Sequence, residues 1–415
     1  MQYLHIVPYI DPRKPSTNGT SAVLNLIARL ERQHRHVFLC CGDAPGEVAL
    51  GVSAVLQHVP VRGYRQHYRT EQILRQAVSF AKWLRRNRDV WELRHHEEGM
   101  VIAHGPESAI FADRVRGECG AMNSIWTVQT HFILGELLDA CHASGLPTRI
   151  LPEAVELQKR HEAFIGALGA FDAIYTENAR SVKGLREAMP CSLKRVARSP
   201  LVAFDSTQFT PGGKCGLQDV FVVAGRCSFE KGHDLAIRAF AMACDRSHAI
   251  RQYELRLFLN GRDGTPYPHQ IAYHQYVRQL VAKGRVEGKV SVSGGLAKPE
   301  LAEVLRRAAG CLVPSRYEPF GILGLEATAC GCKVAVADCA GVAEFGGGLG
   351  MRVFRSADVE QLANILVGFA REKGEGPLVG ERSPDIGKWS EKRVLNVLER
   401  RFVESKVKLP GLQRM

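Results

Sequence analysis

The stretch CLVPSRYEPFGILGLEATACG, residues 311–331, has the sequence pattern that best indicates the fold. A short apolar run precedes a proline-containing turn, and an alanine-rich segment of helical composition follows it. Pro319 fits the first position of a helix, because the N–H group that proline lacks is not needed there. Glu318, just before it, is biased toward an extended conformation. The stretch therefore predicts a buried strand, a loop that carries Glu318 and a helix that carries Glu326.

The two glutamates of this stretch raise the question of a paired-carboxylate enzyme. In one continuous helix, Glu318 and Glu326 would be about 12 Å apart along the axis. Glycosidases hold their two carboxyls at roughly 5 Å or, in the inverting enzymes, below about 10 Å, so the spacing disfavours this class. Gly321 and Gly324 instead leave the helix start uncrowded, so that backbone N–H groups of residues 320–323 can approach an oxyanion. A surface helix with an acidic first turn is the alternative.

The whole chain has 415 residues, which suits two domains better than one. Short apolar runs such as VFVVAG, residues 220–225, alternate with amphipathic segments of helical length. This alternation predicts a layered α/β protein with buried parallel strands. Periodicity is lost in the turn-rich residues 200–216. We therefore expect a first domain over residues 1–203, a second over 204–385, and a helical tail over 386–415 that packs back toward the first.

Composition bears on the compartment in which the protein works. No apolar run approaches the ~18 residues of a membrane span, and the N-terminus enters strand-like sequence directly. The twelve cysteines are scattered, and no pair of CxxC motifs is present. This pattern disfavours structural zinc and indicates small buried residues in a reducing compartment. We expect a cytoplasmic protein, with peripheral attachment to the inner face of the plasma membrane as an option.

The formal net charge is +12, and the excess is concentrated in residues 61–96, which hold nine Lys/Arg and three acids. Apolar residues recur there at helical spacing, so one helix face packs and the other is cationic. A solvated basic helix is one interpretation. An anionic membrane surface or a polyanionic substrate is the other. Nucleic acid is disfavoured, because no recognisable binding module accompanies the charge.

Three loops of the second half follow predicted strands and precede predicted helices, which is where ligands bind in open α/β sheets. The first, AGRCSFEKGHD, places Arg226 and Lys231 around a tight turn, and these two cations are able to neutralise a diphosphate. The second, VSGGLAKPE, contains Gly295, and the third is the opening stretch. Together they predict a nucleotide site. A dehydrogenase is disfavoured, because no G-x-G-x-x-G joins the first strand to the first helix.

In order and spacing, these segments resemble the C-terminal domain of the GT-B retaining glycosyltransferases related to glycogen synthase and the bacterial mannosyltransferases, the glycosyl transferases group 1. The resemblance is strong over residues 221–366. It is weaker at the N-terminal glycine loop, at His131 in TVQTHF and at VAFDSTQFTPG, residues 202–212. The first loop departs from the family, since it has Asn18-Gly19-Thr20 where paired glycines are common.

The resemblance implies two Rossmann-like domains, each a doubly wound parallel sheet, that face across a cleft with the nucleotide-sugar donor between them. The catalytic set that it implies is Glu318, His131, Arg226 and Lys231. Among these, the two cations would hold the donor diphosphate, Glu318 would accept hydrogen bonds from sugar hydroxyls, and His131 would line the sugar pocket, unless it is a core histidine. His104 in VIAHGPES is likewise either a site residue or a core histidine. The further substrate-binding residues implied are Gly19, Gly295, Phe320, Gly321, Ile322 and, at the ribose, Glu326.

The function implied is a retaining glycosyltransferase that moves a sugar from a nucleotide-diphosphate sugar to an acceptor in bacterial cell-surface glycan or lipopolysaccharide assembly. The acceptor expected is a lipid-linked or polyanionic glycan. No metal and no cofactor are expected, since the two cations and the helix start offset the charge of the leaving diphosphate. A non-catalytic nucleotide-sugar-binding subunit and a nucleotide-sugar epimerase of the same fold are the alternatives.

Overall fold

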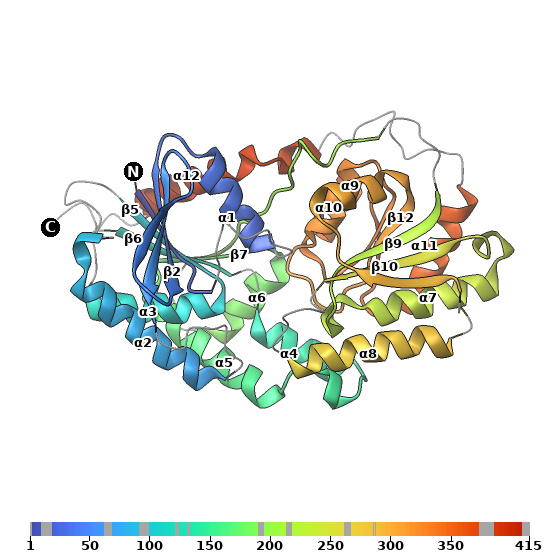
Figure 1. The fold of residues 1–415 in the computed structure, drawn as a ribbon, viewed down its shortest axis with the longest axis horizontal. Helices are drawn as coiled ribbons and strands as arrows, with labels where there is room; N and C mark the ends of the chain where they lie inside the picture. The colour runs from blue at the N-terminus through green and yellow to red at the C-terminus, as the bar shows by residue number, and fades with distance from the viewer. Residues whose placement is uncertain are drawn as a thin grey trace. The chain divides into compact units, whose positions relative to one another are not determined.

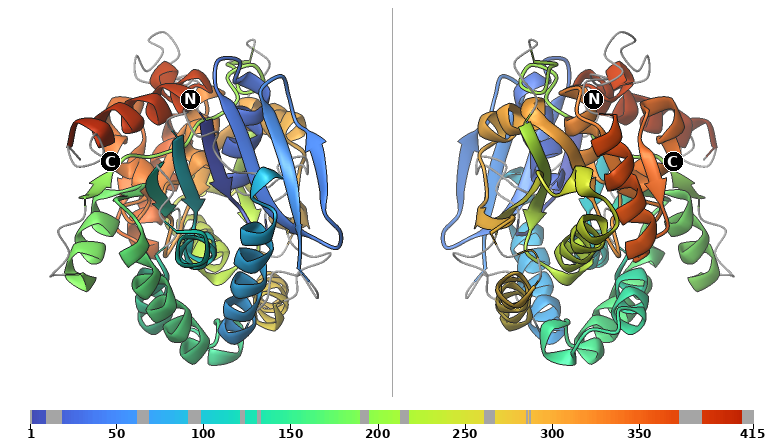
Figure 2. Two further views of the ribbon diagram at one scale, coloured as in Figure 1. Left: turned by 90° about the vertical axis from the view of Figure 1, so that its left-hand side faces the viewer. Right: turned by 90° about the vertical axis from the view of Figure 1, so that its right-hand side faces the viewer.

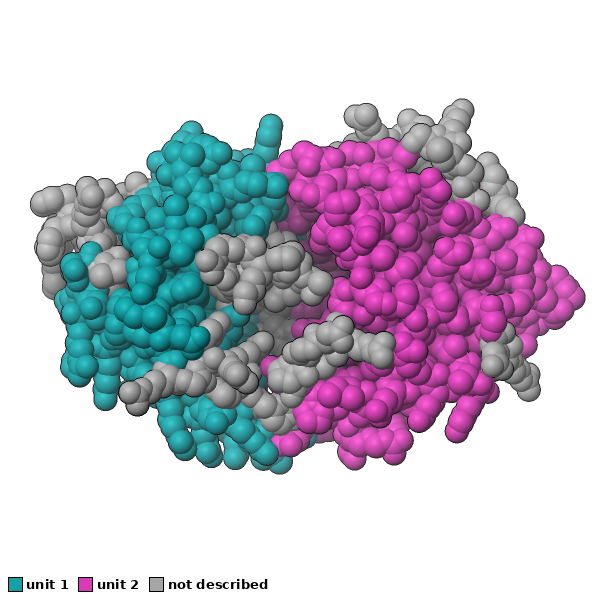
Figure 3. All heavy atoms as spheres, in the orientation of Figure 1, with its two compact units in different colours: residues 1–136, 154–202, 392–415 teal, residues 137–153, 203–391 magenta. Residues whose placement is uncertain are grey.

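The computed structural model describes the chain except for residues 1, 10–18, 62–68, 91–98, 121–123, 131–132, 190–194, 213–217, 261–266, 285, 287, 373–385 and 409–415. Two compact units make up the fold (Figure 3). Unit 1 comprises Met1–Glu136, Ala154–Val202 and Lys392–Met415, and unit 2 comprises Leu137–Glu153 and Ala203–Glu391.

The boundaries of the units differ from the expected ones mainly in two segments, Leu137–Glu153 and residues 386–391, which both group with unit 2. The main division lies at residues 202/203, and the C-terminal Lys392–Met415 groups with unit 1. Leu137–Glu153 groups with unit 2, although it precedes the expected boundary. The reason is that the short 3-10 helix η2 (Thr148–Ile150) packs against α8 (Pro268–Lys283).

Unit 1 is built on an eight-stranded sheet with the order β3-β4-β2-β1-β5-β6-β7-β8 (Figure 1). Its strand pairs are parallel except for β3, which is antiparallel to β4. The central strands are buried along their whole length, as expected for a parallel sheet covered on both faces. The strands are β1 (Gln2–Ile6), β2 (Arg35–Gly42), β3 (Gly46–Ala49), β4 (Ala54–Pro60), β5 (Gly99–His104), β6 (Ser124–Thr130), β7 (Ala173–Thr176) and β8 (Arg195–Arg198).

Helices cover both faces of this sheet. α2, α3 and α5 contact one another on one face, whereas α1 and α12 contact each other on the other (Figures 1 and 2). In α2 the residues Ile73, Ala77, Ala81 and Leu84 are buried, so the expected apolar face is confirmed. The helices are α1 (Gly19–Leu30), α2 (Thr70–Arg86), α3 (Pro106–Cys119), α5 (Ala154–Ala167), α6 (Ala179–Ala188) and α12 (Lys392–Lys408), with the 3-10 helices η1 (Arg88–Val90) and η3 (Leu168–Ala170). Helix α4 (Leu134–Ala143) begins in unit 1, and its residues from Leu137 onward group with unit 2.

The C-terminal helix α12 is anchored to unit 1 by Arg401, which is buried. Its guanidinium donates to Ser199 Oγ at 3.0 Å and to Gln129 Oε1 at 2.5 Å, and it lies 4.2 Å from the centre of the Tyr175 ring. A buried cation needs such partners, because its desolvation is otherwise costly. Arg401 therefore holds α12 in place against β6, β7 and the segment that follows β8.

Unit 2 is built on a six-stranded sheet with the order β11-β10-β9-β12-β13-β14, and all its described strand pairs are parallel. α7 and α8 lie on one face, and α9 and α10 lie on the other (Figure 1). The strands are β9 (Gln218–Arg226), β10 (Glu254–Asn260), β11 (Val290–Gly294), β12 (Ala308–Val313), β13 (Val334–Ala337) and β14 (Arg352–Phe354). The helices are α7 (His233–Arg246), α8, α9 (Lys298–Arg307), α10 (Ile322–Ala329) and α11 (Val359–Arg371), with the 3-10 helices η2, η4 (Phe229–Lys231), η5 (His248–Ile250), η6 (Gly341–Phe345), η7 (Gly347–Leu349) and η8 (Ile386–Trp389).

The predicted α/β architecture with two parallel sheets is confirmed. The predicted helix start is wrong by three residues, because α10 begins at Ile322 and not at Pro319. Gly321 has the left-handed φ of 96°, and the Phe320 carbonyl accepts a 2.7 Å hydrogen bond from Val342 N, so the chain stays non-helical up to this point. No described helix has the length and apolar character needed to cross a membrane.

Candidate active site

The predicted site residues of unit 2 gather where the strand order of its sheet reverses. β9 pairs with β10 on one side and with β12 on the other. Arg226 is the last residue of β9, and the loop that carries Glu318 follows β12. The carboxyl ends of strands at such a switch point are where open α/β sheets bind ligands.

Two backbone segments are docked together at this point. The Glu230 carbonyl accepts hydrogen bonds from Arg316 N at 2.8 Å and from Tyr317 N at 3.3 Å. Gly232 ends the η4 turn with a left-handed φ of 67°, and a Cβ there would lie 1.9 Å from the Pro314 carbonyl oxygen. Only glycine fits this position. The η4 turn, which carries Lys231, and the loop that carries Glu318 are therefore held in contact.

A buried ion pair also holds the loop that carries Glu318. The Arg316 guanidinium donates two hydrogen bonds to the Asp234 carboxylate, each of 2.7 Å, and one of 3.0 Å to the Phe229 carbonyl. The Tyr273 hydroxyl donates to Asp234 Oδ1 at 2.7 Å. Burial alone would raise the pKa of Asp234, but the hydrogen bonds and charge of Arg316 bring that pKa below its ordinary value. The sequence interpretation did not include this pair, whose partners are 82 positions apart.

The structure brings Lys231 and Glu318 into direct contact. Lys231 Nζ lies 2.6 Å from Glu318 Oε2, and Ser315 Oγ donates to the same oxygen at 3.3 Å. Glu318 is mostly buried, and about a quarter of the Lys231 side chain is exposed. Both hydrogen bonds that described side chains make to this carboxylate end on Oε2, so within the described part of the chain Oε1 is the oxygen that remains for a ligand hydroxyl.

Arg226 is held by a second carboxylate. Its Nη2 lies 2.9 Å from Glu230 Oε1, which also accepts a 2.5 Å hydrogen bond from Ser228 Oγ. Burial would raise the pKa of Glu230, and the charge of Arg226 and the Ser228 hydrogen bond outweigh it, so the pKa is lowered. Glu230 is buried, whereas 45% of the Arg226 side chain is exposed. The Glu230 carboxylate thus orients one edge of the Arg226 guanidinium, and the other edges are accessible to a ligand.

The start of α10 adds backbone N–H groups to these cations. The first turn of a helix has no intrahelical acceptor for its N–H groups and carries the positive end of the helix dipole. Phe320 is fixed here by Trp389 of η8, with the ring centres 4.9 Å apart. Gly321 and Ile322 follow as the cap and the first helical residue. The start of α10 therefore suits an oxyanion.

Glu326 lies one turn further into α10 and is buried. Its Oε1 accepts a hydrogen bond from the Lys298 ammonium, which in turn lies 5.5 Å from the centre of the Phe209 ring. Burial raises the pKa of Glu326, and Lys298 opposes this rise. The sequence interpretation named Glu326 but missed Lys298, because nothing in VSGGLAKPE shows that its lysine turns toward α10.

The other predicted site residues are Gly295, Gly19 and His131. Gly295 follows β11, and a Cβ there would overlap Asn260 Oδ1 at 1.1 Å, so glycine is required for this close approach. Gly19 is the first residue of α1. His131 lies outside the described residues. The expectation that Gly19 and His131 contribute to a site with the unit 2 loops stays a prediction.

His104 belongs to the core of unit 1. Its Nε2 lies 2.9 Å from His5 Nδ1, and His5 Nε2 lies 2.8 Å from His36 Nδ1. His36 Nε2 is 3.5 Å from Glu31 Oε2. All three histidines are buried. The interpretation of His104 as a core residue is therefore the better supported one.

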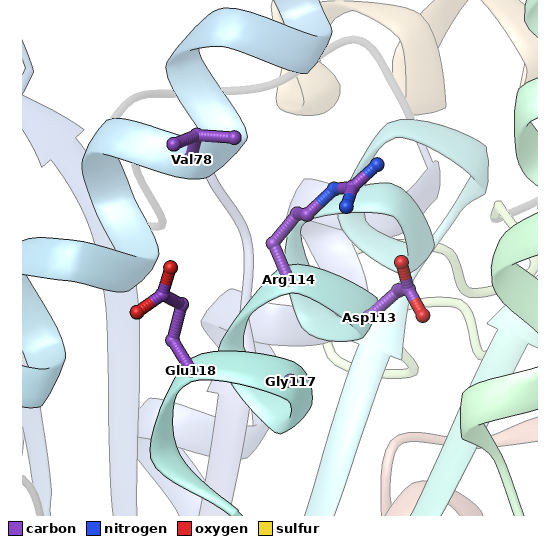
Figure 4. Close-up of a pocket in the computed structure, with 5 residues that line it drawn as sticks. All are labelled: Val78, Asp113, Arg114, Gly117 and Glu118. Atoms are coloured by element: carbon purple, nitrogen blue, oxygen red, sulfur yellow. The ribbon is translucent and has the colours of Figure 1, made fainter.

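A groove in unit 1 lies apart from these residues. It runs between α2 and α3, and Figure 4 shows Arg114 between Asp113 and Glu118, with Val78 on the facing helix. Its charges are mixed, and its lining residues include none of the predicted site residues.

Residues 207–364 match the family model described as glycosyl transferases group 1. The D-inositol 3-phosphate glycosyltransferase of Kribbella flavida is 28% identical over 246 residues, which cover 57% of this chain and 54% of the relative. The mannosylfructose-phosphate synthase of Agrobacterium fabrum is 31% identical over 133 residues, which cover 32% of this chain and 28% of the relative. The chain thus spans about half, or less, of the length of these curated relatives.

Solved structures match over nearly the whole chain. Sucrose-phosphate synthase from Thermosynechococcus elongatus has a TM-score of 0.77 at 14% identity and covers 99% of this chain and 100% of its own. The UDP-forming α,α-trehalose-phosphate synthase from Burkholderia xenovorans has a TM-score of 0.73 at 12% identity, with 97% and 99% covered. At such identities the likeness shows the fold. Residues 207–364 of the chain are thus similar to the glycosyl transferases group 1 family, and the chain has the GT-B fold that the sequence predicted.

Proposed function

We propose that this protein is a retaining glycosyltransferase that takes a sugar from a nucleotide-diphosphate sugar. One observation carries the proposal. Arg226, Lys231, Glu318 and the start of α10 converge at the carboxyl ends of β9 and β12, on a domain of the matching family. Two cations and a helix start form a site for a diphosphate, and the carboxylate beside them is able to bind hydroxyl groups.

The ion pairs indicate how a donor would be accommodated. Arg226 and Lys231 are each paired with one carboxylate, so the site is close to charge balance before an anion enters. A diphosphate would compete for both cations. Lys231 would then move from Glu318 to a phosphate oxygen, and Glu318 would be free to accept hydrogen bonds from the sugar. In this proposal no metal is needed, since the cations and the helix start offset the charge that develops on the leaving group.

The proposed reaction retains the anomeric configuration. The bond from the anomeric carbon to the diphosphate oxygen breaks as the acceptor oxygen approaches on the same face, through an oxocarbenium-like transition state. The departing phosphate oxygen takes the acceptor's proton. Arg226 and Lys231 stabilise this oxygen as it gains charge, and Glu318 orients the sugar.

The acceptor proposed is an anionic molecule. The curated relatives and the structural neighbours include enzymes named for phosphorylated sugars or polyols, which favours a small phosphorylated acceptor. A lipid-linked or polyanionic surface glycan is the second candidate, and the basic helix α2 favours it. Lys82 and Arg86 are exposed there, whereas Arg85 is paired with Glu118 at 3.1 Å. Arg62 and Arg65 lie outside the described residues.

The test of the proposed function is turnover of a donor panel. UDP-, GDP- and ADP-sugars are incubated with the protein, with and without inositol phosphate, hexose phosphates and lipid-linked glycans as acceptors. Acceptor-dependent release of the nucleoside diphosphate, with an α-linked product from an α-linked donor, is the expected result. Epimerised donor without transfer would indicate the epimerase. Binding without turnover on any acceptor would indicate the non-catalytic subunit.

Membrane attachment has a separate test in vesicle cosedimentation. Each cation near an anionic leaflet contributes about 1 kcal/mol, and the attraction is screened over about 8 Å at physiological salt. Binding to anionic vesicles that is lost with salt and on reversal of the charges of Lys82, Arg86 and Arg88 would support a membrane-bound acceptor. Equal vesicle binding by the wild type and the variant would favour a soluble acceptor and a solvated face of α2.

A further inference from the structure

Lys298 is the first residue of α9, and its side chain reaches across to α10. The ammonium pairs with Glu326 Oε1, and 39% of the Lys298 side chain is exposed, against 5% of the Glu326 side chain. Lys298 is a cation beside the candidate site that the sequence interpretation did not include. It lies beside a carboxylate that is otherwise buried.

Lys298 favours the charged form of Glu326 and so opposes the effect of burial, which raises the pKa of this carboxyl. Among the described residues, Lys298 is the side chain that hydrogen bonds to the Glu326 carboxylate, and it does so through Oε1. The nearby Asp205 carboxylate and the buried thiols Cys311 and Cys330 offer no compensating positive charge. A buried carboxyl without a cation tends to bind a proton, and a protonated oxygen donates a hydrogen bond where a carboxylate would accept one.

Lys298 is held in place from its other side. Its ammonium lies over the Phe209 ring, which is itself buried. The segment that carries Phe209 is bound to the far end of α9, because Arg306 donates to the Gln208 carbonyl at 2.7 Å and to the Thr210 carbonyl at 3.0 Å. Gly212 packs on the same arginine, with a Cβ position 3.1 Å from Arg306 Cβ. Lys298 is thus positioned between a fixed aromatic face and Glu326, as a preorganised contact requires.

We propose that Lys298 is a positioning residue that determines specificity for the ribose of the donor nucleotide. It keeps Glu326 as a carboxylate, bonded through Oε1, so that Oε2 accepts hydrogen bonds from the vicinal hydroxyls of a ribonucleoside diphosphate. This inference rests on the proposed function and adds a consequence to it. The protein discriminates against nucleotides that lack a ribose hydroxyl, and this discrimination requires the cation on α9.

The experiment measures binding of UDP, GDP and ADP by calorimetry and then compares the best of them with its 2′-deoxy and 3′-deoxy forms. The variants are Lys298→Met, which removes the charge at similar length, and Lys298→Arg, which keeps it. Lys283→Met is the matched control, because Lys283 is an exposed lysine at the end of α8 in the same unit. A melting curve of each variant checks that it is folded.

We expect the wild type and Lys283→Met to bind the ribonucleotide at least tenfold more tightly than one of its deoxy forms. Lys298→Met should weaken binding of the ribonucleotide about tenfold and that of the deoxy form less than threefold, so that the discrimination is lost. Lys298→Arg should retain most of it. A purely structural role would weaken both ligands equally.

Two results would overturn the inference. If the wild type binds a ribonucleotide and Lys298→Met keeps the full discrimination, or weakens both ligands equally, Lys298 does not position Glu326 for ribose, and the proposed function stands. If the folded wild type binds none of the three nucleotides, the proposed function fails and the inference fails with it.

Discussion

Replacing Arg316 with methionine tests whether the buried pair with Asp234 holds the candidate site together. Only 6% of the Arg316 side chain and 1% of the Asp234 side chain are exposed. The substitution would leave Asp234 buried with the Tyr273 hydroxyl as its remaining side-chain donor. Loss of one partner of a buried pair costs about 3–5 kcal/mol, because the other charge is left uncompensated. With a urea m-value of about 2–3 kcal/mol/M, the midpoint of unit 2 should fall by about 1–2.5 M.

The assay is urea unfolding followed by far-ultraviolet circular dichroism, with hydrogen exchange on peptides from β9 and β12 to assign the change to unit 2. Arg246→Met is the matched control, because Arg246 pairs with Glu360 at 2.7 Å on the surface, where 38% and 66% of the two side chains are exposed. Such pairs contribute less than about 1 kcal/mol. Asp234→Leu combined with Arg316→Met should lose less stability than Arg316→Met alone. Equal midpoints for Arg316→Met and Arg246→Met would show that the buried pair stabilises unit 2 no more than the surface pair does.

Three further predictions concern the glutamates, a glycine and a histidine. Glu318→Gln should lower kcat and Glu326→Gln should mainly raise the donor KM in steady-state assays, because only the first contacts the reacting sugar; the reverse pattern would show that these roles are exchanged. Gly232→Ala should weaken nucleotide binding at least tenfold in calorimetry, because its Cβ would meet the Pro314 carbonyl; unchanged affinity would mean that the loop moves freely. Burial lowers the pKa of His233 to about 4, so stability is full above the unfolded value of about 6.5 and falls by about 3 kcal/mol as the pH drops from there to about 4. Urea midpoints measured across this pH range should show the fall for the wild type. An equal dependence of the midpoint on pH for the wild type and His233→Asn would mean that the histidine is not responsible.

Much of unit 2 was predictable because its strands are continuous apolar runs and its loops have their own turn signals. Arg226, Lys231 and Glu318 stand at strand ends, where position along the chain indicates position in the sheet. The start of α10 was misplaced because proline is acceptable both in a first turn and before one. The left-handed Gly321 and the hydrogen bond to the Phe320 carbonyl decide between these options, and the donor of that bond, Val342, belongs to η6, which lies later in the chain.

The partners of the site residues were not predictable from local patterns. Asp234 and Arg316 pair across 82 positions, and Lys298 and Glu326 across 28. Each such pair depends on which helix faces which, and charge spacing along the chain does not contain this information. The grouping of Leu137–Glu153 with unit 2 has the same origin, since it follows from packing against α8.

Arg226 and Lys231 are proposed to form the diphosphate site of a nucleotide-sugar donor. Calorimetric titration of UDP, GDP and ADP into the wild type, Arg226→Ala, Lys231→Ala and the control Lys283→Met tests this assignment. A charge-assisted hydrogen bond is worth about 1.5–3 kcal/mol, so each alanine variant should bind the preferred nucleotide roughly 10- to 150-fold more weakly, with the control unchanged. Folded wild type that binds no nucleoside diphosphate, or alanine variants with wild-type affinity, would contradict the claim.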